Sequence, residues 1–180
     1  MSIFLGLDIS SSCVGVALVE SIDGKIIKID TIDLKNKNYF PDLYAKAERV
    51  KNYLLDLKCE FSINSVYIES PLLMFHTGKS SAHAISVLTK FNGIVSWLCK
   101  EQLNIVPIHI SASSARKICG IKTIKGKKAK ECVMNFLLEK EEEFSKIIEF
   151  SKKGNIVPKY YDMADAFIIA KTAYYLNKDK

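Results

Sequence analysis

The sequence predicts a single α/β domain in which helices flank a mixed five-stranded sheet. Two observations support this fold class. Short β-rich runs fill the first third of the chain, and helix-period patterns alternate with two more strand-like runs after it. A chain of 180 residues that is 48% hydrophobic can bury one substantial core but is too short for two ordinary domains. Residues 1–180 are therefore expected to form one domain.

Five short runs have the composition of strands. They cover Ile3 to Ile9, Cys13 to Glu20, Lys25 to Leu34, Ser65 to Glu69 and Ile105 to Ile110. The first three are close together, and the turn dipeptide Asp23-Gly24 separates the second from the third, which predicts an antiparallel meander. The last two follow helical segments, so we expect parallel strands there.

Helical periodicity predicts four helices. They cover Asp42 to Lys58, about Ser80 to Glu101, about Lys128 to Glu142 and about Tyr161 to Leu176. Each has apolar residues every three to four positions, and Pro41 stands just ahead of the first. A Ser-rich segment covers Ser111 to Ser114, and the residues between the last two helices are expected to form a linker.

The charge balance and the cysteines narrow the class of protein. A net charge of +6 and a pI near 9.0 favour a polyanionic partner. The five cysteines are scattered and lack zinc-ligand spacing, so we expect reduced and mostly buried thiols. The start lacks the features of a signal peptide, and no apolar run approaches the ~20 residues that span a bilayer. We therefore expect a cytoplasmic protein without a membrane partner.

Two carboxylates stand at the ends of apolar strands. Asp8 lies near the end of the first strand, and Glu69 ends the run that begins at Val66. A buried charge is costly unless it is paired or binds a metal ion, so each acid needs a partner. Ligand sites of α/β proteins open at the carboxyl ends of strands, which is where both acids are expected.

A second pair of acids lies on the last predicted helix. Asp162 and Asp165 are three positions apart, which places both on one helical face. If this helix packs beside the first strand, four carboxylates converge, and two charges ~4 Å apart repel by roughly 4 kcal/mol at an effective dielectric constant of about 20. Oxygen ligands of this kind suit Mg²⁺, for which Mn²⁺ can substitute. Taken singly, each acid is more simply explained as a cap, turn or surface residue, so the prediction depends on the set.

The order of these motifs resembles the RuvC-like Holliday junction resolvases, a family of phages, viruses and bacteria with a ribonuclease H-like fold. The run from Leu5 to Ala17 is similar to the family's first strand, turn and second strand, with Asp8 in the place of the first metal ligand. Tyr67-Ile68-Glu69 resembles the second acidic motif, and the run from Asp162 to Ala166 resembles the closing helix. Phe91-Asn92-Gly93-Ile94 is similar to a segment of the helix that contributes to the family's dimer.

This resemblance implies a metal-dependent endodeoxyribonuclease that resolves four-way DNA junctions by paired symmetric nicks. The implied catalytic residues, which are also the ligands of two Mg²⁺ ions, are Asp8, Glu69, Asp162 and Asp165. Paired nicks in a substrate of approximate two-fold symmetry favour a homodimer with one site per protomer. The implied compartment is the cytoplasm or, for a viral protein, the replication compartment of an infected host cell.

Three alternatives remain open. The first is a nuclease that acts on flaps, forks or RNA with the same acids. The second is a junction-binding protein without catalysis, against which the four acids argue because DNA binding gains nothing from clustered negative charge. The third is a small phosphate-binding ATPase module, which would need a second domain of similar size.

A basic segment precedes the last acid pair. From Ser111 to Lys130 there are seven cationic residues and no acid. Contact with DNA phosphates is the predicted role, and a solvated loop and helix face is the alternative. The predicted DNA-binding residues are Arg116, Lys117, Lys122, Lys125, Lys127 and Lys128.

Two residues in the loop after Glu69 are candidates for contact with the centre of the junction. Phe75 can stack on an unpaired base, and His76 can approach the scissile phosphate. For Phe75, a role as a hydrophobic anchor of the loop is an equally good explanation. For His76, an ordinary loop histidine is the simpler explanation. Elsewhere, we expect His109 to be a hydrogen-bonded residue at a strand end, and Phe91 and Trp97 to pack in the core or in a dimer.

Overall fold

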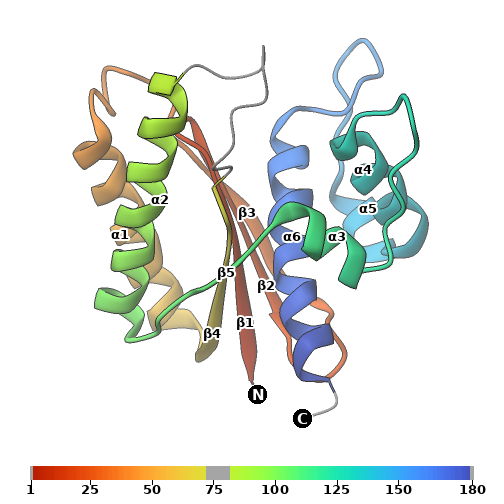
Figure 1. The fold of residues 1–180 in the computed structure, drawn as a ribbon, viewed down its shortest axis with the longest axis horizontal. Coiled ribbons are helices and arrows are strands. Elements are labelled where there is room, and N and C mark those ends of the chain that lie inside the picture. Colours follow the sequence, from red (N-terminus) through yellow and green to blue (C-terminus); the bar gives the residue numbers. More distant parts are fainter. Residues whose placement is uncertain (1, 72–81, 179–180) are drawn as a thin grey trace.

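The structure, a computed structural model, describes residues 2–71 and 82–178, and its helices form three layers, one on one face of the sheet and two on the other. Helices α1 (Leu43–Glu60) and α2 (Ala82–Leu103) cover one face of the central sheet, and α6 (Lys159–Asn177) covers the other (Figure 1). The remaining helices lie outside α6 and form the third layer. They are α3 (Ala112–Ile118), α4 (Ala129–Lys140) and α5 (Glu142–Ile147).

The sheet has the predicted mixed topology, with strand order β3-β2-β1-β4-β5. Its strands are β1 (Ile3–Ile9), β2 (Cys13–Glu20), β3 (Ile26–Asp33), β4 (Ile63–Glu69) and β5 (Ile108–Ile110). The first three pair antiparallel, whereas β4 pairs parallel with both β1 and β5. β5 is shorter than predicted, and Pro107 directly before it has no backbone N–H to donate to a ladder.

Alternation along the strands separates the two faces of the sheet. In β1, the side chains of Leu5 and Leu7 are buried in the core beneath α1 and α2, whereas Phe4 belongs to the core on the α6 side. Because successive side chains of a strand point to opposite faces, Gly6 and Asp8 face α6 together with Phe4. The strand thus sends its acid toward the helix that carries the other two aspartates.

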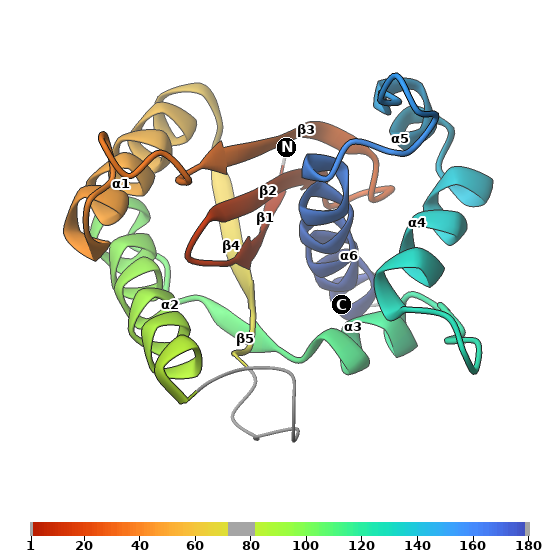
Figure 2. The same cartoon turned by 90° about the horizontal axis from the view of Figure 1, so that it is seen from above.

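Two glycines allow α6 to lie directly on the sheet (Figure 2). A Cβ atom at Gly6 would be 2.4 Å from the carbonyl oxygen of Ala166, and one at Gly15 would be 2.2 Å from the carbonyl oxygen of Asp162. No side chain fits at such distances, so both positions require glycine. The close approach holds the first half of α6, with its two aspartates, against β1 and β2.

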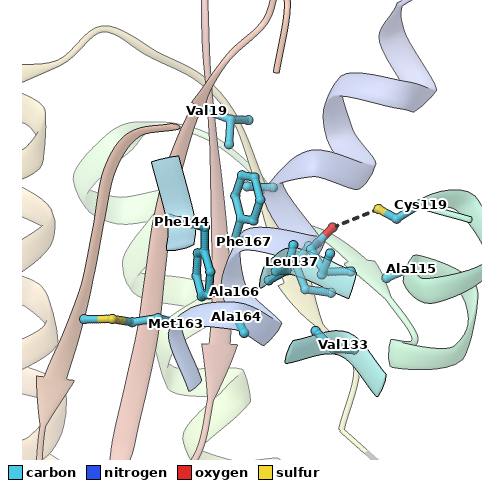
Figure 3. Packing of buried hydrophobic residues seen from close by; sticks show 14 of the residues in the cluster. Val19, Ala115, Cys119, Val133, Leu137, Phe144, Met163, Ala164, Ala166 and Phe167 are labelled. Carbon is cyan, nitrogen blue, oxygen red and sulfur yellow. Dashed lines mark hydrogen bonds between the residues drawn. The ribbon is translucent and has the colours of Figure 1, made fainter. Parts of the chain in front are cut away.

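The third layer is attached to α6 by an apolar core (Figure 3). Phe144 of α5 stacks on Phe167 of α6, with ring centroids 6.0 Å apart and an interplanar angle of 14°. Val133 and Leu137 of α4 are buried in the same core. Two short helices were not predicted: α3 begins within the Ser-rich segment, and α5 occupies the first part of the stretch predicted as a linker.

Other sequence expectations concern residues that the structure places directly. All five cysteines are free, and four of them are buried; Cys59 is exposed. Asp42 caps α1 by accepting hydrogen bonds of 2.9 Å from the backbone N–H groups of Tyr44 and Ala45. Within residues 2–71 and 82–178, no helix is both long and apolar enough to cross a membrane.

Candidate active site

The four predicted carboxylates line one pocket at the carboxyl ends of β1 and β4. The pocket has a volume of about 210 Å³. Asp8 enters it from β1, Glu69 from β4, and Asp162 and Asp165 from the first two turns of α6. Three segments that are far apart in the sequence therefore deliver their acids to one place.

Strand register and helix spacing explain this convergence. Asp8 and Glu69 each lie two residues beyond a residue that faces α6, namely Gly6 in β1 and Tyr67 in β4, so both point to that side. The close contact of α6 with Gly15 places Asp162 beside β2, and Asp165 follows on the same helical face. Asp162 lies near Cys13, at the start of β2, where burial, followed by the charge of Asp162, raises the pKa of the thiol to about 12.

Lys130 supplies a cation to this acidic pocket. Its Nζ atom lies 3.4 Å from Oδ1 of Asp162 and 3.2 Å from Oδ2 of Asp165. Lys130 was counted in the basic segment but was not predicted as a site residue. The signal was its spacing: it precedes the buried residues Val133, Met134 and Leu137 by three, four and seven positions, which puts a cation on the apolar face of α4.

Burial and mutual repulsion of the acids disfavour their ionised forms. Burial, followed by the charges of Glu69 and Asp165, raises the pKa of Asp8 well above its ordinary value. The pKa values of Glu69 and Asp165 are also raised, in both cases mainly by burial. Burial would lower the pKa of Lys130, but the surrounding aspartates raise it instead, so this lysine stays protonated. One lysine in contact with two aspartates leaves the pocket short of positive charge.

The donor set suits a hard divalent cation, although its side chains are not arranged as a finished ligand group. Among the residues that the structure describes, no three His, Cys, Asp or Glu side chains are placed so that they could together hold a metal ion. Carboxylate oxygens are nevertheless the ligands that Mg²⁺ and Mn²⁺ prefer. Because Lys130 contacts both Asp162 and Asp165, a cation bound by these two acids would compete with it.

The predicted DNA-binding residues divide into two groups in the structure. Arg116 of α3 is near enough to the pocket for its charge to offset part of the rise in the pKa values of Glu69 and Asp165. Together with Lys117 and Lys122 it also lines a neighbouring open groove of about 620 Å³. The other three lysines, Lys125, Lys127 and Lys128, are exposed in the connection between α3 and α4.

The remaining candidates lie elsewhere. Phe75 and His76 lie outside the described residues. His109 is hydrogen-bonded as expected, with Nε2 3.2 Å from Oγ of Ser96, and it does not line the acidic pocket. On α2, Phe91 is fully buried in the core, whereas Trp97 is 60% exposed. Trp97 lines an apolar groove of about 720 Å³ between α2 and the start of α1.

The strand order and the helices on both faces of the sheet define a ribonuclease H-like fold, with the carboxylate pocket at its strand ends. No protein-family model and no curated protein sequence matches the chain. Solved structures do match. Two structures of Thermus thermophilus RuvC superpose with TM-scores of 0.65. The RuvC chain in complex with a Holliday junction substrate is 14% identical to this chain, and the other is 16% identical.

The coverage of these matches is nearly complete. Both alignments span 98% of this chain. They cover 95% of the RuvC chain in the complex and 96% of the other RuvC chain. The yeast mitochondrial Holliday junction resolvase Ydc2 matches with a TM-score of 0.63 and 15% identity, over 98% of this chain and 80% of that chain. The predicted fold, that of RuvC, is thus confirmed. At these identities the likeness is one of fold.

Proposed function

We propose that the protein is a Mg²⁺-dependent endodeoxyribonuclease that resolves four-way DNA junctions by paired symmetric nicks. The observation that carries this proposal is the meeting of Asp8, Glu69, Asp162 and Asp165 in one pocket of a RuvC-like fold. Such a cluster weakens DNA binding unless cations neutralise it, so its presence favours catalysis over binding alone. Broader cleavage of flaps and forks is the second candidate, because it would use the same acids.

The four carboxylates would serve as the oxygen ligands of the metal. Bound Mg²⁺ would supply Lewis-acid stabilisation of the phosphoryl oxygens and an activated water for in-line attack. Asp8, the most strongly perturbed acid, lies at the centre of the set and would bind metal in its ionised form. Lys130 would then be free to donate a hydrogen bond to a phosphate oxygen and to stabilise charge in the transition state.

The basic groove beside the pocket would seat the DNA backbone. Arg116 borders both the acids and this groove, and Lys117 and Lys122 continue it away from the pocket. Contacts of this kind position the duplex without reading its sequence. Lys125, Lys127 and Lys128 would reach phosphates farther along the strand.

A homodimer would provide the two sites that paired nicks require. The groove lined by Leu43, Tyr44, Gly93, Ile94 and Trp97 is the proposed interface. Tyr44 is 80% exposed and Trp97 60% exposed, and exposed aromatic residues around a groove are typical of protein interfaces. A Cβ atom at Gly93 would contact nothing within 4 Å, so a partner helix can approach closely there.

The decisive experiment is cleavage of a labelled four-way junction, beside a flap and a linear duplex, by the wild type and Asp8→Asn. With Mg²⁺ we expect paired symmetric nicks in the junction, leaving 5′-phosphate and 3′-hydroxyl ends. Asp8→Asn should lower the rate by roughly 10³-fold or more, because the pocket loses a charged ligand. EDTA should abolish cleavage by the wild type.

The other outcomes separate the alternatives. Equal cutting of all branched substrates would make the protein a general branch nuclease. Tight junction binding without cutting in Mg²⁺ or Mn²⁺ would contradict the catalytic proposal. If Asp8→Asn binds the junction as tightly as the wild type does, its loss of activity is not caused by a failure to fold.

A further inference from the structure

Asn92 is a buried polar residue in the middle of α2. Its side chain is 3% exposed, although asparagine is a poor helix former and an unpaired buried amide costs stability. Residues on either side of it, Phe91 and Val95, are fully buried apolar side chains of the core. Asn92 therefore lies where the apolar core borders the acidic pocket, and its buried amide needs a hydrogen-bond partner.

The amide is bonded to the strand end that carries Glu69. The Nδ2 atom of Asn92 donates a 3.0 Å hydrogen bond to the backbone carbonyl oxygen of Glu69. The register between β1 and β4 ends at the pair Leu7–Ile68, so Glu69 lies one residue beyond it. Asn92 thus restrains β4 at the point where its pairing with β1 stops.

Further contacts hold Asn92 itself in place. The hydroxyl group of Ser96, one turn later in α2, donates a 2.7 Å hydrogen bond to the backbone carbonyl oxygen of Asn92. The same hydroxyl oxygen lies 3.2 Å from Nε2 of His109 in β5. Asn92 also lines the acidic pocket. A chain of hydrogen bonds therefore joins β5, α2 and the end of β4.

We propose that Asn92 is a positioning residue that fixes the orientation of Glu69 for metal binding, an inference that rests on the proposed function. Groups that orient metal ligands usually matter nearly as much as the ligands, and their loss costs roughly 10- to 100-fold in metal affinity or activity. No contact of Asn92 with DNA is needed for this role. Its loss should weaken Mg²⁺ binding and leave junction binding unchanged.

The test compares Asn92→Leu, which keeps the branched shape of the side chain and removes the donor, with Thr172→Val. Thr172 is fully buried in α6 and donates a 2.8 Å hydrogen bond to the carbonyl oxygen of Ile168, so its substitution removes a buried hydrogen bond away from the pocket. Mg²⁺ affinity is measured by isothermal titration calorimetry on the full chain. We expect Asn92→Leu to weaken it about 10- to 100-fold and Thr172→Val to leave it unchanged.

Cleavage supplies a second measurement. For Asn92→Leu we expect a reduced kcat that recovers as the Mg²⁺ concentration is raised, with an unchanged dissociation constant for the junction in saturating Ca²⁺. If Asn92→Leu does not fold, Asn92→Ala serves in its place. Wild-type Mg²⁺ affinity in the Asn92 variant, whether Asn92→Leu or Asn92→Ala, would overturn the role of Asn92 and leave the proposed function standing. A wild-type protein that binds no Mg²⁺ would overturn both.

Discussion

The two faces of the sheet are built from the same strands but differ in what they tolerate. Beneath α1 and α2, alternate residues of β1, β2 and β4 contribute apolar side chains such as Leu5, Val16 and Ile68 to one core. On the α6 face, the intervening positions include two glycines and two acids, Gly6, Gly15, Asp8 and Glu69. Side-chain packing holds both faces, and on the α6 face a close approach of backbone to backbone is added at the two glycines.

This difference explains why the acids can gather where they do. A helix held at an ordinary distance by side chains would keep Asp162 and Asp165 away from β1. Because glycine lets α6 approach, the cluster forms without long side chains, and Lys130 enters from the third layer to offset part of its charge. The site thus depends on the absence of side chains as well as on the presence of acids.

The largest effect is expected where that close approach is blocked. In Gly15→Ala, the new Cβ atom would be 2.2 Å from the carbonyl oxygen of Asp162, so the backbone must shift. We expect a loss of about 3 kcal/mol or more in the free energy of unfolding, measured by urea denaturation, together with loss of Mg²⁺ binding.

The matched control is the same substitution in α2. In Gly93→Ala, the Cβ atom would meet nothing within 4 Å, and alanine is the better helix former by about 1 kcal/mol. We therefore expect this variant to be slightly more stable than the wild type. Equal destabilisation by both substitutions would show that α6 does not depend on close contact with β2.

Sequence patterns predicted much of this arrangement. β-rich composition between turn residues located four strands to within two residues at each end. The three-residue spacing of Asp162 and Asp165 placed both on the face that lines the pocket. Lys130 was missed because it lies within a run of similar lysines, and only its position relative to the buried face of α4 distinguishes it. α3 and α5 were missed because each is about two turns or less, too short to establish a helical period.

The second prediction concerns the apolar groove on the α1–α2 side. Trp97→Ala should raise the dimer dissociation constant by about 30-fold, corresponding to the roughly 2 kcal/mol of an interface hot spot. Analytical ultracentrifugation over a concentration series measures it. The control is Phe150→Ala: Phe150 is 61% exposed, much like Trp97, but lies outside the groove. A monomeric wild type, or equal effects of the two substitutions, would reject this interface.

The third prediction uses the raised pKa of Asp8. The folded, metal-free protein retains a proton on Asp8 at pH values where the unfolded chain has released it. This group's contribution to stability therefore falls as the pH rises from about 4 through the raised folded pKa. Asp8→Asn carries no such charge, so in EDTA at pH 8 it should melt roughly 2 to 4 °C above the wild type.

Differential scanning fluorimetry at a series of pH values checks this difference, which should disappear near pH 4. Saturating Mg²⁺ should reverse the order at pH 8, because a ligand at 100 times its dissociation constant stabilises the wild type by about 2.7 kcal/mol. If Asp8→Asn and the wild type melt alike in EDTA at every pH, the carboxylates do not repel one another as their burial implies.

The smallest effect is expected in the basic groove, where single surface cations act additively. Lys122→Ala should weaken junction binding only several-fold, but should lower the slope of log K against log salt by about 0.9, the value for one lost phosphate contact. Fluorescence anisotropy in Ca²⁺ from low to moderate salt measures it. Lys58→Ala is the control: Lys58 lies near the end of α1, just before the start of β4 and thus far from the strand ends that form the pocket. It should leave the slope unchanged, and equal slopes for both variants would place the DNA elsewhere on the surface.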